Sequence, residues 1–128
     1  MGGHEVESSG VSDVVALPGG ALLALERAFG TIGFRIRLYE VDLSGATDVS
    51  ALPALRGAHY VPVAKRLLWE RVFPDYDFEG AALGPALADG SNSLVLISDN
   101  GHAFRQGLYG LTAKAKGERQ EGRASARP

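Results

Sequence analysis

The sequence predicts an all-β fold built from antiparallel sheets, and an internal repeat is the main reason. An apolar hairpin over residues 14–26 follows Asp13, and a similar one over residues 81–97 follows Glu79. Both hairpins turn through glycine, which supplies positive φ at low cost. Strand-like units that recur after several tens of residues are typical of β-propeller blades. A complete propeller needs roughly 4–8 blades, so the 128 residues are expected to form about two blades of an incomplete β-propeller.

The first half of the chain contains three expected strands. Residues 14–17 and 21–26 are joined through Pro18-Gly19-Gly20. Residues 21–27 also suit a helix, because Ala, Leu and Glu are good helix formers, but the flanking glycines and the short length favour a strand. The clearest strand spans residues 34–43, where apolar and polar side chains alternate from Phe34 onward.

The second half contains weaker signals. Residues 49–57 are expected to be a connection with room for one helical turn. Residues 65–72 have helical spacing, but their place in the repeat predicts an outer strand. Residues 79–83 and 93–98 are almost continuously apolar, which predicts strands buried on both faces. A last, shorter strand is expected at residues 107–113.

Composition predicts one structured region and excludes some function classes. Residues 10–113 form the expected structured region, while residues 1–9 and 114–128 are polar and expected to be disordered. The net charge of −2 and pI of 5.9 give no electrostatic support for nucleic-acid binding. No apolar run approaches the roughly 20 residues of a membrane span, and no cysteine is available for thiol chemistry.

A series of short motifs keeps its order along residues 10–111. The motifs are Gly10-Val11-Ser12-Asp13, Leu25-Glu26-Arg27, Phe34-Arg35-Ile36-Arg37-Leu38-Tyr39, Phe78-Glu79-Gly80, Leu83-Gly84-Pro85 and Ser98-Asp99-Asn100. In this order they resemble the phytase-like domain family, also described as having esterase-like activity. The resemblance implies the C-terminal part of a secreted or periplasmic β-propeller, with a phosphoric ester or ester as substrate and calcium as cofactor.

The acids beside the strands are the candidate binding residues. Asp13 and Glu79 are expected to begin equivalent inner strands and to face one channel mouth, where calcium would find oxygen ligands. Antiparallel pairing predicts that Asp13 approaches Glu26 and that Glu79 approaches Asp99. The alternative is that acids at strand ends cap loops or remain solvated.

Two further residues are expected beside these acids. Arg27 would neutralise charge or bind phosphate through its planar fork, and Asn100 would orient a ligand. A strand-end ion pair between Glu26 and Arg27 is the alternative to phosphate binding.

No catalytic residue can be identified from the sequence. The three histidines lack the spacing of metal ligands, and no serine lies in a Gly-x-Ser-x-Gly elbow. Three interpretations therefore remain open: a segment of a phosphoric-ester hydrolase-like propeller, a non-catalytic propeller segment that binds a structural ion or partner, and an inactive fragment. Open sheet edges also predict self-association.

Overall fold

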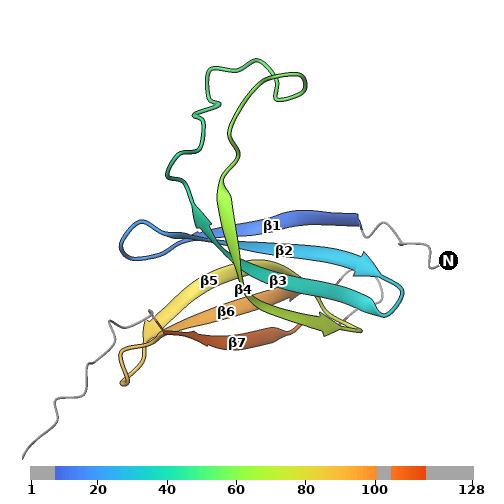
Figure 1. Ribbon diagram of the computed structural model, residues 1–128. Coiled ribbons are helices and arrows are strands. Elements are labelled where there is room, and N and C mark those ends of the chain that lie inside the picture. The colour runs from blue at the N-terminus through green and yellow to red at the C-terminus, as the bar shows by residue number, and fades with distance from the viewer. Residues whose placement is uncertain (1–7, 101–104, 115–128) are drawn as a thin grey trace, which may run out of the picture.

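The fold consists of seven strands in two antiparallel sheets (Figure 1). The computed structural model describes residues 8–100 and 105–114. The first sheet has the order β1 (Ser8–Ala16), β2 (Leu22–Gly30), β3 (Gly33–Asp42) and β4 (Ala64–Phe73). The second sheet has the order β5 (Asp77–Ala86), β6 (Asn92–Asp99) and β7 (Leu108–Ala113). The described residues contain no helix, hence none able to cross a membrane, and the predicted all-β, antiparallel class is confirmed.

The first hairpin of each sheet closes through the same five-residue turn. In residues 17–21 and 87–91, the first residue donates a backbone hydrogen bond to the fifth, with an N···O distance of 2.8 Å in both turns. It also accepts a hydrogen bond from the fourth residue, which is Gly20 in one turn and Gly90 in the other. These glycines have φ angles of 90° and 80°, a region that other residues rarely adopt. The repeat in the sequence is therefore a repeat in the backbone.

The ambiguous segments are resolved in favour of strands. The segment that also suited a helix forms β2, which pairs along its length with β1 and β3. The segment with helical spacing at residues 65–72 lies within β4 and pairs with β3. Residues 49–57 contain backbone turns and no helix. The expected disordered ends lie almost entirely outside the described residues.

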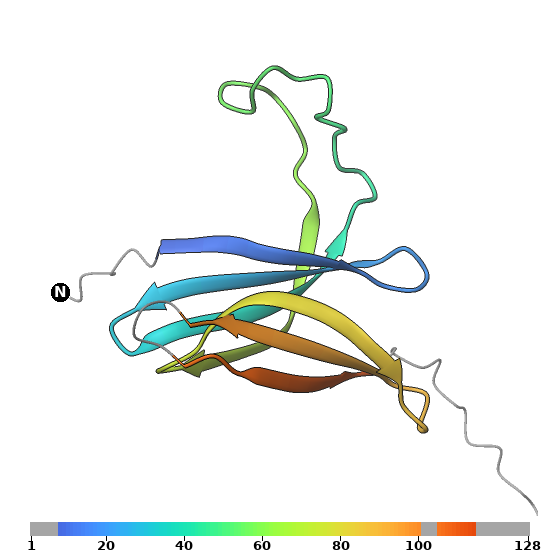
Figure 2. The ribbon, with the colours of Figure 1, turned by 180° about the vertical axis from the view of Figure 1, so that it is seen from behind.

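The two sheets stack on each other and enclose one core (Figures 1 and 2). Its buried members come from both layers: Leu23, Leu25, Phe34, Ile36, Leu38 and Phe73 of the first sheet, and Phe78, Leu94 and Leu96 of the second. At one end Phe73 packs against Phe78 and Tyr109, with ring centroids 4.8 and 5.2 Å apart. β5, the first strand of the second sheet, comes closest to β1 and β2.

A long connection projects away from the stacked sheets between β3 and β4 (Figures 1 and 2). We call residues 43–63 the arm. Two hydrogen bonds close its base: Thr47 N donates to Val61 O, and Val61 N donates to Thr47 Oγ1, at 2.9 and 2.8 Å. The arm carries exposed apolar side chains, among them Leu55 and Tyr60.

Candidate functional site

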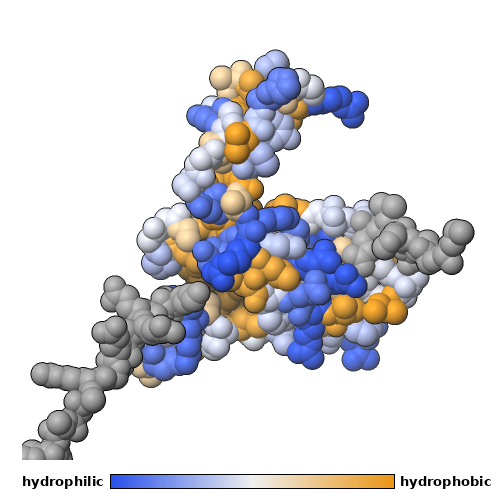
Figure 3. Space-filling view, in the orientation of Figure 1, coloured by the Kyte–Doolittle hydropathy of each residue, from blue (hydrophilic) through white to orange (hydrophobic). Residues whose placement is uncertain are grey.

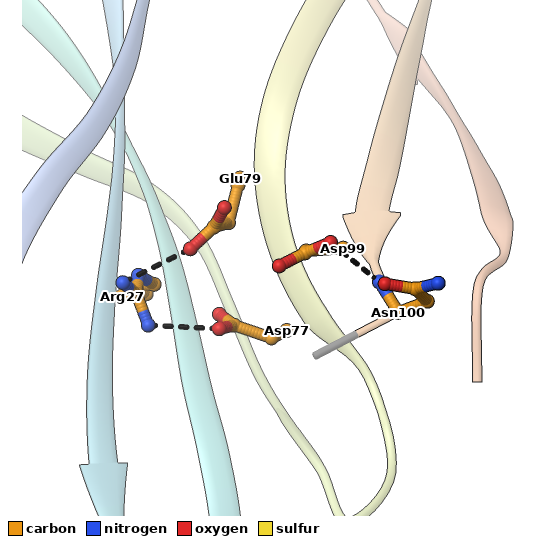
Figure 4. A network of polar contacts seen from close by, with 5 residues as sticks. All are labelled: Arg27, Asp77, Glu79, Asp99 and Asn100. Atoms are coloured by element: carbon orange, nitrogen blue, oxygen red, sulfur yellow. Dashed lines mark hydrogen bonds and ion pairs between the residues drawn. The ribbon is translucent and has the colours of Figure 1, made fainter. Parts of the chain in front are cut away.

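Arg27 of β2 joins the two sheets through a pair of acids at the start of β5. Its Nη1 lies 2.8 Å from Oδ2 of Asp77, and its Nη2 lies 3.0 Å from Oε1 of Glu79 (Figure 4). The Asp77 side chain is 13% exposed, while Arg27 and Glu79 keep 39% and 41% exposure. Asp77 is therefore the least exposed member of the two ion pairs, and the other two side chains face solvent.

Asp99 and Asn100 lie at the end of β6, next to this group. Asp99 is opposite Asp77 in the β5–β6 ladder, and its charge acts on that neighbour. The backbone N of Asn100 donates to Oδ1 of Asp99 at 2.7 Å. In Figure 4 Asn100 lies on the far side of Asp99 from Arg27. The predicted residues Arg27, Glu79 and Asp99 thus fall in one cluster, with Asn100 at its margin.

The surroundings of Asp77 raise the pKa of its carboxyl group. Burial raises the pKa of Asp77 above its ordinary value, and Arg27 only partly offsets this effect. The charges of Glu79 and Asp99 raise this pKa further. Oδ1 of Asp77 is also buried without a hydrogen-bond partner among the described residues. Two carboxylates therefore pair with one guanidinium, and the third, Asp99, lies opposite Asp77, which leaves the cluster with an excess of negative charge when all three are ionised.

A β-bulge places Glu79 in this cluster. A bulge leaves Ser12 of β1 and Glu79 of β5 out of their ladders, and β5 has a second irregularity between Leu83 and Ala86 that β1 lacks. The strands pair again directly afterwards, at Asp13 and at Gly80. Ser12 is therefore the structural counterpart of Glu79. The prediction that Asp13 and Glu79 occupy equivalent positions is wrong by one residue, because the sequence repeat does not reveal the bulges.

Asp13 fastens the two first strands to each other. Its Oδ2 accepts a hydrogen bond from the backbone N of Ala81 in β5, and its Oδ1 accepts one from Val14 N, both at 2.8 Å. Both carboxylate oxygens thus have amide partners. The structure gives Asp13 a contact between sheets and does not place it in the Arg27 cluster.

Glu26 lies apart from the other candidates. It is opposite Val11 in the β1–β2 ladder, whereas Asp13 is opposite Leu25, so Glu26 and Asp13 occupy opposite faces of the sheet. Glu26 forms an ion pair with Lys65 of β4 instead. The predicted approach of Asp13 to Glu26 is therefore wrong, since the bulge at Ser12 shifts the register.

A cleft of about 440 Å³ opens beside the cluster. Residues 8–12 of β1, Arg27 and Phe29 of β2, and Glu79 of β5 line it. Its walls combine a guanidinium, a carboxylate and an aromatic ring with the serine-rich start of β1. This composition suits a polar ligand that carries an apolar group.

Comparison with known proteins identifies the family. A sequence model of the phytase-like family, described as esterase-like activity of phytase, matches residues 3–102 of the 128. The chain belongs to the phytase-like family. No curated protein and no solved structure matches it.

The phytase-like chain also contains a site residue that sequence reasoning missed. Asp77 is the first residue of β5 and lies two residues before Glu79. The sequence predicts that this strand begins only at Glu79, so Asp77 is not among the predicted site residues. The available signal was the run Asp75-Tyr76-Asp77-Phe78-Glu79, in which acids and aromatics alternate. Among residues 8–100 and 105–114, no three acidic or histidine side chains form a group able to hold a metal ion. The calcium site at Asp13 and Glu79 stays a prediction, although these residues contact different partners.

Proposed function

We propose that the chain supplies two neighbouring blades of a phytase-like β-propeller. The first sheet is a four-stranded meander, and the second repeats its first three strands with the same turn and the same bulge. β1 and β5, the first strands of the two sheets, lie beside each other. Innermost strands of neighbouring blades have this relation around a central channel.

The Arg27 cluster would then contribute to ester binding at the channel. The observation that supports this role is the position of Arg27. It joins the first sheet to the second through two ion pairs, and it lines the cleft while remaining half-exposed. A guanidinium has five N–H donors, so Arg27 can hold the two acids and still donate to an oxygen of a phosphoric or carboxylic ester. Phe29 would lie against the apolar part of such a ligand. Hydrolysis itself would require groups beyond those assigned here, and we expect the isolated chain to bind without turnover.

The excess of carboxylates favours a second candidate, a structural cation site. Asp77, Glu79 and Asp99 carry more negative charge than Arg27 neutralises. Hard oxygen ligands suit calcium, which would attract a phosphate group to the cleft when bound. The described residues hold no preformed set of three ligands, so we expect weak affinity.

Amide chemical-shift mapping tests both candidates. Phenyl phosphate is titrated into the labelled chain, with and without calcium, and the experiment is repeated with Arg27→Gln. We expect shifts at residues 8–12 and at Glu79, and affinity at least about tenfold weaker in the variant, the loss of one charge-assisted hydrogen bond. Arg56→Gln in the exposed arm is the matched control. Shifts elsewhere, or equal affinities in the two variants, would refute ester binding, whereas shifts with calcium alone would favour the structural ion.

A further inference from the structure

Equivalent side chains of the two sheets differ in burial in a regular way. The bulges define which residues of the two sheets are equivalent. Leu25 is the cross-strand partner of the first residue after the bulge in the first sheet, and Ile97 is the corresponding partner in the second. Their neighbours on the third strand are Leu38 and Leu108. Leu25 and Leu38 are 1% and 5% exposed because the second sheet covers them, whereas Ile97 and Leu108 are 44% and 72% exposed.

The opposite faces show the reverse relation. Phe78 precedes the bulge of the second sheet and is 2% exposed, because it packs toward the first sheet. Its counterpart Val11 is 61% exposed on the outer face of the first sheet. On that outer face Val14, Ala24 and Tyr39 form a cross-strand row, in which Val14 is 52% exposed and the small side chain of Ala24 is 6% exposed.

The second sheet has an equivalent row that is covered. Ala81, Leu96 and Tyr109 are opposite one another across β5, β6 and β7, and all three pack into the core. Each sheet therefore has two different faces, and the two sheets are oriented alike, so that unlike faces meet between them. The covered face of either sheet resembles the uncovered face of the other.

We propose that copies of this chain stack head to tail, with the outer face of the second sheet against the outer face of the first sheet of the next copy. This inference rests on the proposed propeller, and it repeats between copies the contact that each chain makes between its own sheets. On the outer face of the first sheet Glu26 pairs with Lys65 and Arg37 with Glu70, so burial of these four charges would cost desolvation but would leave none of them without its partner. Figure 3 shows exposed apolar surface on the stacked sheets and at the foot of the arm.

Such a contact is heterologous, because two different surfaces meet. Heterologous contacts generate a ring when the rotation closes and a filament when it does not. With two sheets per chain, about 2–4 copies would complete a propeller of ordinary size. A face-to-face dimer of two first sheets would instead be isologous, and the two arrangements respond differently to mutation.

Complementation between two blocked variants tests the proposal by sedimentation velocity. Val14→Asp places a charge on the outer face of the first sheet, and Leu108→Asp places one on the outer face of the second. Each residue is exposed, at 52% and 72%, so both variants are expected to keep the wild-type circular dichroism. We expect oligomers of the wild type, a monomer of each variant alone, and a 1:1 dimer when the variants are mixed. Ile32→Asp, at a 68% exposed turn position, is the control that should leave assembly unchanged.

Several outcomes would overturn head-to-tail stacking. These are a wild-type monomer at all concentrations, a mixture that stays monomeric, or a Leu108→Asp variant that still dimerises. If Leu108→Asp fails to fold, Ile97→Asp replaces it on the same face. Titration of monomeric Leu108→Asp with phenyl phosphate separates the two proposals, because it measures ester binding without assembly. If the variant binds the ester and the wild type stays monomeric, only stacking is refuted. If the wild type assembles and the variant does not bind the ester, only the proposed site is refuted.

Discussion

Replacement of Asp13 by alanine should loosen the contact between the two sheets. The substitution removes the acceptor of the Ala81 amide, a partly buried hydrogen bond of 2.8 Å between β1 and β5. A hydrogen bond to a charged group contributes about 1.5–3 kcal/mol. The second bond of Asp13, to Val14 N, is exposed and adds little. Since the acid itself is partly exposed, we expect a loss of about 1.5–2 kcal/mol in the free energy of unfolding.

Urea unfolding followed by circular dichroism measures this loss. Asp13→Asn keeps an oxygen acceptor without the charge and should lose about half as much. Asp42→Ala is the matched control, because its carboxylate also accepts a 2.8 Å amide hydrogen bond, from Ser44, in an exposed turn. It should change stability by less than about 0.5 kcal/mol. If Asp13→Ala and Asp42→Ala unfold at the same urea concentration, and hydrogen exchange of the Ala81 amide is unchanged, the inter-sheet role of Asp13 is wrong.

Two further predictions concern the charge cluster and the backbone. The folded-state pKa of Asp77 is raised, so its ionised form costs stability, and this cost appears as the pH rises from about 4, the ordinary value in the unfolded chain. Asp77→Asn should therefore lessen the loss of stability, measured as the urea midpoint, as the pH rises above about 4, and an unchanged pH dependence would contradict the assignment. Gly33→Ala should destabilise strongly, by more than about 2 kcal/mol, because φ is +121° and the new Cβ would lie 2.5 Å from the backbone O of Phe73. Gly20 also has a positive φ, +90°, but open space around it, so Gly20→Ala should lower the free energy of unfolding by only about 1 kcal/mol, measured in thermal melts. Equal losses of stability in the two variants would refute the steric argument.

The strands could be predicted because their apolar patterns and glycine turns are local. β3 alternates cleanly, and the turns at residues 17–21 and 87–91 contain the glycines that their backbone requires. The conformation of β4 was harder to predict, since the spacing of its apolar residues also fits a helix. Only its pairing with β3 decides for a strand. The arm could not be given a structure from its sequence, because its order rests on backbone turns and on one closing pair at its base.

The candidate site was predicted in composition but not in geometry. Arg27, Glu79 and Asp99 could be chosen because charges beside apolar strands stand out in the sequence. Their partners depend on register, and a single bulged residue exchanges the face on which every later side chain lies. This displacement separates Asp13 from Glu26, whereas the pairing of Asp77 with Arg27 depends on how the two sheets stack. Pattern alone does not show where a strand departs from its ladder.

The shared bulge has a consequence for which changes of sequence this chain can accept. Ser12 and Glu79 occupy the same structural position, yet one is a neutral hydroxyl and the other a carboxylate that pairs with Arg27. A bulged residue lies outside the alternation of its strand, so its replacement leaves the packed rows on either side in register. Each first strand thus has a position beside the cleft at which the side chain can change without a shift of the ladder, although in β1 the hydroxyl oxygen of Ser12 is buried. Selection for a new ligand could act on that position while the sheets remain unchanged.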